Sequence, residues 1–157
     1  MYETLQSAMN IGRLTIPNRI VMTAMGTNFA KPGGGVSDNL IAFYEARARG
    51  GVGLIISEIT RIDEGPGIGE PSQMSAVRPS DIQDLQRLTD AVHKYETKFF
   101  VQLQHPGREA SSFVSGAQPV APSPIPNPLG GETPRALSEL ECEALIEKFA
   151  QGAWIAS

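Results

Sequence analysis

Apolar runs alternate with amphipathic segments along this chain. Three apolar runs have no helical period and are bounded by turn-forming residues, so they predict buried strands at residues 18–25, 52–57 and 98–103. Three segments with apolar residues at helical spacing predict helices at residues 39–49, 80–92 and 138–157. Before the first strand, Asn10 and Gly12 stand between apolar residues, which predicts a short hairpin at residues 9–16.

The helix ends carry their own signals. Gln83 stands three residues after Ser80, and Glu141 stands three residues after Ser138. Both serines are therefore predicted to open a helix through a capping box. The pair Gly50 and Gly51 is expected to end the first helix. The proline-rich stretch at residues 104–137 is interpreted as one long loop.

The order strand, helix, strand, helix, strand, helix predicts an α/β fold with parallel strands and right-handed crossovers. A doubly wound sheet and part of a (β/α)₈ TIM barrel both fit this order. A complete barrel needs about 250 residues, and only three strand–helix units are recognisable here. Residues 1–157 are therefore expected to form an incomplete domain, a piece of a larger structure.

Composition narrows the class of protein. The 157 residues carry 13 Lys and Arg against 17 Asp and Glu, a formal net charge of −4, and show no basic stripe, so a nucleic-acid partner is not expected. A membrane span is not expected either, because the chain has no long apolar run. The N-terminus does not resemble a signal peptide, and Cys142 is the only cysteine, so a reducing, cytoplasmic setting and no metal site are expected.

In parallel α/β folds, ligands bind at the carboxyl ends of the strands. Residues 24–27, 57–60 and 102–105 are predicted to lie there, and their mixed donors and acceptors suit an uncharged heteroaromatic ring. The carboxamide of Gln102 can pair with an adjacent N–H and C=O of such a ring, or it can satisfy loop carbonyls. Gly26 either lets a ligand approach the backbone closely or forms an ordinary turn.

Two titratable residues have competing interpretations. Glu58 is a candidate general base, but a buried ion pair with an arginine is the favoured interpretation. His105 precedes Pro106 and Gly107, and it either titrates near neutral pH or orients the loop, with the second interpretation favoured. The glycine-rich run at residues 65–69 does not have the spacing of a dinucleotide fingerprint.

Several segments, in order, resemble the old yellow enzyme family. They are Pro17–Met22, Tyr44–Ile56, Gln102–Arg108, Pro119–Ser123 and the Pro-Arg-Ala-Leu run at residues 134–137. The resemblance implies a (β/α)₈ barrel that binds FMN, takes hydride from NADH or NADPH, and reduces activated C=C bonds. Carried over by position, it implies FMN contacts at Ala24, Met25, Gly26, Ile59 and Gln102.

The resemblance also has limits. Gly26 stands where many members have Thr or Cys, and the run at residues 25–29 is more similar to the branch of 2,4-dienoyl-CoA and 2-enoate reductases. The residues that the family uses for the substrate carbonyl and for proton donation come later in its members, so no catalytic residue is assigned here.

The expected function is the N-terminal segment of an FMN-dependent oxidoreductase acting on a small unsaturated carbonyl compound. The alternative is a catalytically inactive fragment that serves as an assembly or binding module. In both cases, self-association or contact with the remainder of a barrel is expected.

Overall fold

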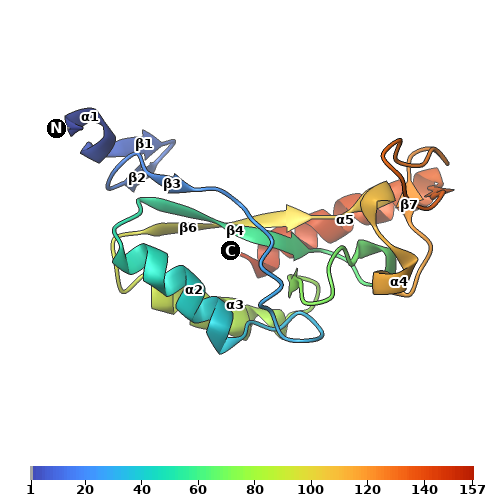
Figure 1. Ribbon diagram of the computed structural model, residues 1–157, viewed down its shortest axis with the longest axis horizontal. Coiled ribbons are helices and arrows are strands. Elements are labelled where there is room, and N and C mark those ends of the chain that lie inside the picture. The colour runs from blue at the N-terminus through green and yellow to red at the C-terminus, as the bar shows by residue number, and fades with distance from the viewer. Residues whose placement is uncertain (1) are drawn as a thin grey trace.

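The computed structural model describes residues 2–157, in which a parallel sheet carries helices on one face (Figure 1). The helices are α1 (Glu3–Gln6), α2 (Asp38–Arg49), α3 (Asp81–Val92), α4 (Ser112–Ser115) and α5 (Glu139–Ile155). The strands are β1 (Met9–Ile11), β2 (Leu14–Ile16), β3 (Val21–Met22), β4 (Leu54–Arg61), β5 (Met74–Ser75), β6 (Lys98–Gln104), β7 (Val120–Ala121) and β8 (Arg135–Ala136). Two 3₁₀ turns, η1 (Gly65–Gly67) and η2 (Gly107–Glu109), lie in the loops.

Strand β4 is the centre of the sheet. It pairs in parallel with β3 on one side and with β6 on the other, and the short strand β5 pairs with its last residues, Thr60 and Arg61. The N-terminal hairpin of β1 and β2 forms a separate antiparallel pair, as predicted. The expected α/β class, with a hairpin before three strand–helix units, is therefore confirmed.

The hydrophobic core lies between the sheet and helices α2 and α3 (Figure 1). Tyr44 of α2 is fully buried, and its ring meets that of Phe99 edge-on, with 5.4 Å between the centroids. The opposite face of the sheet is much less covered, because Val21 and Phe100 keep 38% and 39% of their surface exposed. Apolar side chains in the middle of a parallel sheet are normally buried on both faces.

Strand β4 contains a bulge directly before the predicted site. Ile56 is opposite Phe100 and Ile59 is opposite Gln102, so β4 uses one residue more than β6 over this step. The polar groups displaced by the bulge find new partners. The backbone N–H of Glu58 donates to the hydroxyl oxygen of Tyr44 at 2.7 Å.

Of the two predicted capping boxes, one forms and the other does not. Ser37 accepts from the N–H of Leu40 to open α2, and Ser138 forms the predicted capping box of α5. The predicted capping box at Ser80 is wrong, since this side chain makes no capping bond. Ser80 already has a helical backbone, and the Asp81 carboxylate accepts from the backbone N–H groups of residues 77 and 78, which precede the helix, and from the Ser75 hydroxyl.

Two strand lengths also differ from the prediction. The first strand is paired only over Val21–Met22, not over residues 18–25, because the chain leaves the sheet after Met22 to cross the end of β4. The second strand runs on to Arg61 rather than ending at Ser57.

The region at residues 104–137 is not one loop, because it contains η2, α4 and the parallel pair of β7 and β8. No helix within residues 2–157 is long and apolar enough to cross a membrane.

Candidate functional site

The residues predicted to bind a ligand come together at one end of the sheet. Ile59 of β4 and Gln102 of β6 are register partners on neighbouring strands. The segment Ala24–Gly26 follows β3. The next residue, Thr27, holds this segment against the end of β4, because its backbone N–H donates to the Glu58 carboxylate at 2.9 Å. Ala24–Gly26, Ile59 and Gln102 are called the strand-end cluster below.

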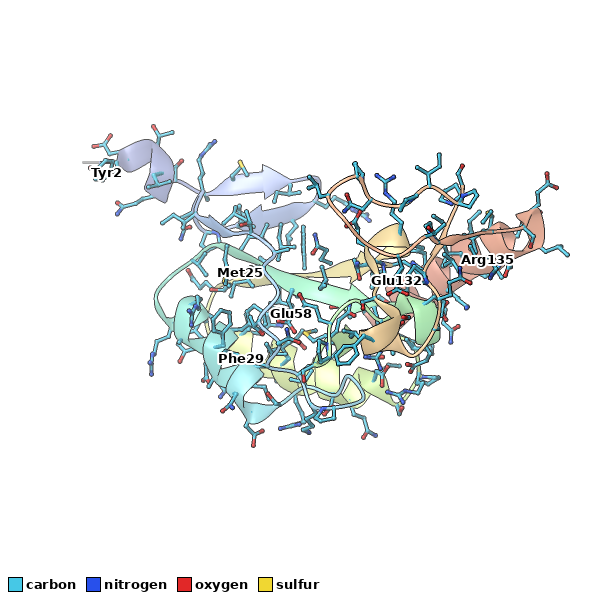
Figure 2. The ribbon with its side chains drawn as sticks, turned by 45° about the vertical axis from the view of Figure 1, so that its right-hand side comes forward. Tyr2, Met25, Phe29, Glu58, Glu132 and Arg135 are labelled. Carbon is cyan, nitrogen blue, oxygen red and sulfur yellow. The ribbon has the colours of Figure 1, made fainter. Side chains whose placement is uncertain are left out.

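Figure 2 shows how the segment after β3 brings Met25 and Phe29 into the region of Glu58. Met25 exposes 56% of its surface, and Gly26 is also exposed. Ala24, Ile59 and Gln102 are half-buried. The strand-end cluster therefore presents an open surface rather than a sealed core.

Gln102 is positioned through its backbone, while its side chain is left available. Its N–H donates to the hydroxyl oxygen of the fully buried Ser57 at 3.0 Å, across the bulge of β4. Among residues 2–157, the carboxamide of Gln102 has no hydrogen-bond partner. A half-buried carboxamide with both functions unused fits a ligand edge that offers a neighbouring acceptor and donor.

Glu58 differs from its predicted role. Within the described residues it forms no ion pair with an arginine, so that interpretation is wrong. Its Oε2 accepts hydrogen bonds from both the backbone and the hydroxyl of Thr27. Burial raises the pKa of the Glu58 carboxyl, the hydrogen bonds from Thr27 oppose this rise, and the nearby Glu70 adds to it. The bulge explains the difference, because it turns Glu58 toward the crossing segment.

His105 follows the second of its two interpretations. Its Nδ1 accepts the backbone N–H of Gly107 at 3.0 Å, which orients the loop after β6. Burial lowers the pKa of His105, while Asp63 raises it and Lys148 lowers it further. The hydrogen bond from Gly107 requires an unprotonated Nδ1, and the lowered pKa favours that form.

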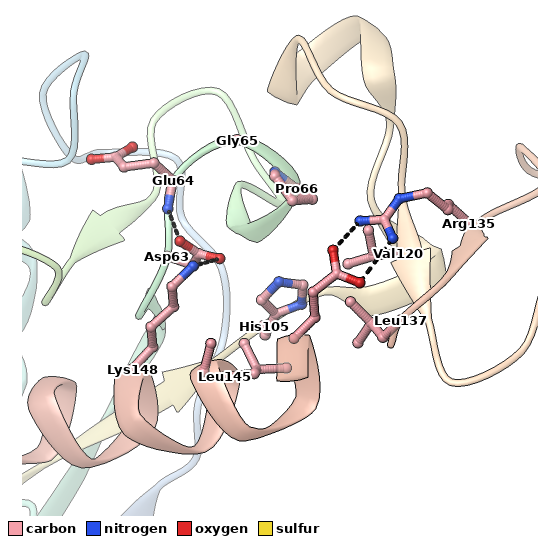
Figure 3. A pocket seen from close by; sticks show the side chains of 12 residues that line it. Asp63, Glu64, Gly65, Pro66, His105, Val120, Arg135, Leu137, Leu145 and Lys148 are labelled. Carbon is pink, nitrogen blue, oxygen red and sulfur yellow. Dashed lines mark hydrogen bonds and ion pairs between the residues drawn. The ribbon is translucent and has the colours of Figure 1, made fainter. Parts of the chain in front are cut away.

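His105 also lines a cavity of about 380 Å³ beside α5 (Figure 3). Two ion pairs flank the imidazole. Lys148 Nζ lies 2.7 Å from Asp63 Oδ2, and Arg135 Nη2 lies 2.6 Å from Glu141 Oε1. None of the residues of the strand-end cluster lines this cavity, so it is separate from the predicted ligand site.

The sequence placed Ser57 at the predicted strand end but did not indicate its supporting contact, and it gave no indication of Gln73 and Glu70. Ser57 holds the backbone of Gln102, Gln73 donates to the side chain of Gln104 at 2.8 Å, and Glu70 packs against Gly26. The only signal for Ser57 was its position as a small polar residue inside an apolar run. Gln73 and Glu70 lie in the glycine-rich stretch after β4, where no pattern indicates a partner.

This arrangement has the groups needed to bind a flat polar ring. The segment Ala24–Gly26 offers backbone donors and acceptors, and Gln102 offers a carboxamide without a partner within residues 2–157. Neither the thiol of Cys142 nor the imidazole of His105 belongs to the strand-end cluster. The cluster itself therefore offers ligand binding and orientation rather than a nucleophile or a general base.

Comparison with known proteins identifies the family. Residues 5–157 match the NADH:flavin oxidoreductase / NADH oxidase family, so the chain belongs to that family. It is 43% identical over 153 residues to an NADH oxidase of Thermoanaerobacter brockii, and this match covers 97% of the chain and 24% of that protein. It is 33% identical over 165 residues to a cinnamate reductase of Clostridium sporogenes, covering 99% of the chain and 24% of that protein.

A solved structure supports the fold. The old yellow enzyme homologue from Zymomonas mobilis superposes with a TM-score of 0.85 at 32% identity, over 98% of this chain and 45% of that one. The chain thus spans about a quarter of the length of these curated relatives. The expected resemblance to the old yellow enzyme family is confirmed.

Proposed function

We propose that the strand-end cluster is one wall of an FMN site in an NAD(P)H-dependent oxidoreductase that reduces activated C=C bonds. The unused carboxamide of Gln102, beside its register partner Ile59, is the observation that carries the proposal. Family membership supports it independently. An oxidoreductase of this kind needs its protein mainly to bind, orient and electrostatically adjust the cofactor.

The cluster residues have distinct parts in this proposal. The carboxamide of Gln102 pairs with the pyrimidine edge of the isoalloxazine, donating from Nε2 and accepting at Oε1. The exposed backbone of Ala24–Gly26 and the backbone near Ile59 lie along the ring. When bound, FMN supplies hydride transfer from NADH or NADPH to the β-carbon of the substrate. The chain's own contribution is to hold the ring and keep its edge away from water.

The substrate class follows from the relatives. They include a cinnamate reductase and an NADH oxidase. We therefore assign a small unsaturated carbonyl compound to this protein, with either nicotinamide as the hydride donor. The single cysteine and the proposed use of NADH or NADPH as hydride donor both fit a cytoplasmic setting.

We further propose that residues 1–157 are part of an FMN-binding barrel domain that other strand–helix units complete. Val21 and Phe100 on the sheet face away from the helices remain more than a third exposed, and they are suited to the interior of such a barrel. This same feature favours the second candidate function, an inactive module that assembles through its uncovered sheet face. The first function requires that the protein bind flavin, whereas the assembly module does not.

The test is a fluorescence titration of FMN into the 157-residue chain and its Gln102→Leu variant. Two hydrogen bonds of about 0.5–1.5 kcal/mol each are lost, so the Kd is expected to rise about 5- to 150-fold. Gln83→Leu, at an exposed position of α3, is the matched control and should leave the Kd unchanged. Equal Kd values for Gln102→Leu and the wild type contradict the assignment of Gln102. A chain that never quenches FMN supports the assembly module instead.

A further inference from the structure

Two carboxamides extend from the same face of strand β6. Phe99 and Leu103 pack against the core, whereas Phe100 is exposed on the uncovered face of the sheet. Side chains alternate between the two faces of a strand, so Gln102 and Gln104 share the uncovered face with Phe100. Gln104 is the last residue of β6 and lies about 7 Å beyond Gln102 along the strand. It therefore stands next to the strand-end cluster, toward the open end of the sheet.

A chain of hydrogen bonds fixes which end of the Gln104 carboxamide is free. The backbone N–H of Gly69 donates to Oε1 of Gln73 at 2.8 Å, and a backbone N–H can only donate. Because Oε1 of Gln73 is assigned in this way, its Nε2 is the atom that donates to Oε1 of Gln104 at 2.8 Å. Oε1 of Gln104 is then occupied, and the group left over is its Nε2, which is a donor.

Gln73 cannot easily turn its carboxamide over. The residue is fully buried, and its backbone carbonyl accepts from Nη1 of Arg61 at 3.2 Å. A turned carboxamide would place its NH₂ against the N–H of Gly69, which would leave a buried donor without an acceptor. The orientation of Gln104 is therefore set from the interior of the protein.

The free donor of Gln104 is accessible and neutral. Its Nε2 has no partner among residues 2–157, and the unpaired side-chain atoms that are buried in this part of the chain all lie on other residues. Arg61, the register partner of Gln104, adds no free cation, because its guanidinium donates to the carbonyls of Gly33 and Gln73. A neutral donor of this kind fits an uncharged oxygen acceptor.

The two carboxamides thus offer different chemistry. Gln102 keeps both a donor and an acceptor, which suits a ring edge with both functions, whereas Gln104 offers one donor only. We propose that Gln104 is a substrate-binding residue that donates from Nε2 to a carbonyl oxygen of the unsaturated substrate. Gln73 is the positioning residue that holds it in this orientation. This inference rests on the proposed function and names the residue that recognises the substrate oxygen within it.

The test compares two ligands of the 157-residue chain loaded with FMN. Benzylideneacetone is an enone whose oxygen can only accept, whereas the corresponding allylic alcohol can also donate. Kd values come from backbone amide shifts of the ¹⁵N-labelled chain. Gln104→Leu removes the donor and should raise the Kd of the enone about 2- to 12-fold, while the Kd of FMN changes by less than about twofold. Gln83→Leu, on the exposed side of α3, is the matched control and should change neither.

Gln104→Glu separates recognition from packing. The carboxylate has nearly the same shape and still accepts from Gln73, but it presents an oxygen to the ligand in place of the NH₂ group. At about pH 8, where an accessible carboxyl is ionised, the ratio of enone affinity to alcohol affinity should fall about tenfold relative to the wild type. Gln73→Leu lets the Gln104 carboxamide turn and should lower the same ratio by a smaller factor. A purely structural role would weaken both ligands equally.

The outcomes separate this inference from the FMN wall. Enone binding that Gln104→Leu weakens and that Gln104→Glu shifts toward the alcohol supports the inference. An unchanged enone Kd in Gln104→Leu, an unchanged ratio in Gln104→Glu, or no enone binding to the FMN-loaded chain overturns it and leaves the FMN wall standing. Loss of FMN affinity in Gln104→Leu as large as in Gln102→Leu also overturns it, by assigning Gln104 to the ring. A wild-type chain that binds no FMN overturns the FMN wall, and this inference with it.

Discussion

The hydroxyl oxygen of Ser57 accepts the backbone N–H of Gln102 at 3.0 Å, across the point where β4 bulges away from β6. The same hydroxyl donates to the carbonyl of Glu58 at 2.8 Å. One fully buried side chain thus replaces the ladder bonds that the bulge removes. It also fixes the backbone position of Gln102, and therefore the point on β6 from which the carboxamide extends.

Ser57→Ala should therefore lower both stability and flavin affinity. The variant leaves the N–H of Gln102 without its partner, while the carbonyl of Glu58 keeps the Thr60 hydroxyl at 3.2 Å, and the expected cost is about 1–3 kcal/mol in the free energy of unfolding. Urea denaturation measures this loss, and Ser123→Ala, an exposed serine in the proline-rich region, is the control. A Ser57→Ala chain as stable as this control contradicts the role given to the hydroxyl.

Glu58→Gln tests the sign of the charge effect on stability. The folded-state pKa of Glu58 lies above its unfolded value, so the folded state binds the proton more tightly. The stability contributed by Glu58 is then complete below the unfolded pKa of 4.5 and is lost as pH rises through the folded pKa. Relative to Glu58→Gln, the wild type should become less stable from about pH 4.5 upward. Urea melts at several pH values measure the difference, and an opposite slope would disprove the assignment.

The isolated chain should not turn over an enone with NADH or NADPH. The cluster supplies one side of a ring-binding site, and within residues 2–157 it contains no group assigned to the substrate carbonyl or to proton donation. Consumption of the nicotinamide in the presence of FMN and cinnamate is the measurement, with a full-length relative as the positive control. Steady turnover by the purified chain would show that the wall is sufficient alone.

Self-association is expected for the chain alone. Val21 and Phe100 are more than a third exposed on the uncovered sheet face, and β3 and β6 are edge strands. At about 25 cal/mol per Å², a few hundred Å² of wet apolar surface costs several kcal/mol, against a typical stability of about 5–15 kcal/mol. Analytical ultracentrifugation with a urea melt tests this. A sharp transition of a monomer, independent of concentration, contradicts the expectation.

The helices could be predicted from the sequence because their signals are local. Ser138 and Glu141 form a capping box within one turn, and α2 begins at the residue after Ser37. The capping box expected at Ser80 does not form, because Ser80 already has a helical backbone and the next carboxylate, Asp81, binds the turn before the helix, which adjacent sequence does not reveal.

The site could be predicted in part. Gln102 and Ile59 were placed together correctly because parallel strands end at one edge of the sheet. The bulge was not predictable, because it depends on buried partners for Ser57 and Glu58 that lie on other elements. The contact of Glu70 with Gly26 depends on a loop whose position is fixed only by distant hydrogen bonds.

The most direct test of the FMN wall is to locate FMN on the chain itself. FMN is titrated into the ¹⁵N-labelled 157-residue chain, and chemical-shift changes are followed for every assigned amide. We expect the largest changes on the side-chain NH₂ of Gln102 and on the backbone of Met25, Gly26 and Ile59. Changes confined to the cavity around His105 and Lys148, or no changes at all, would contradict it.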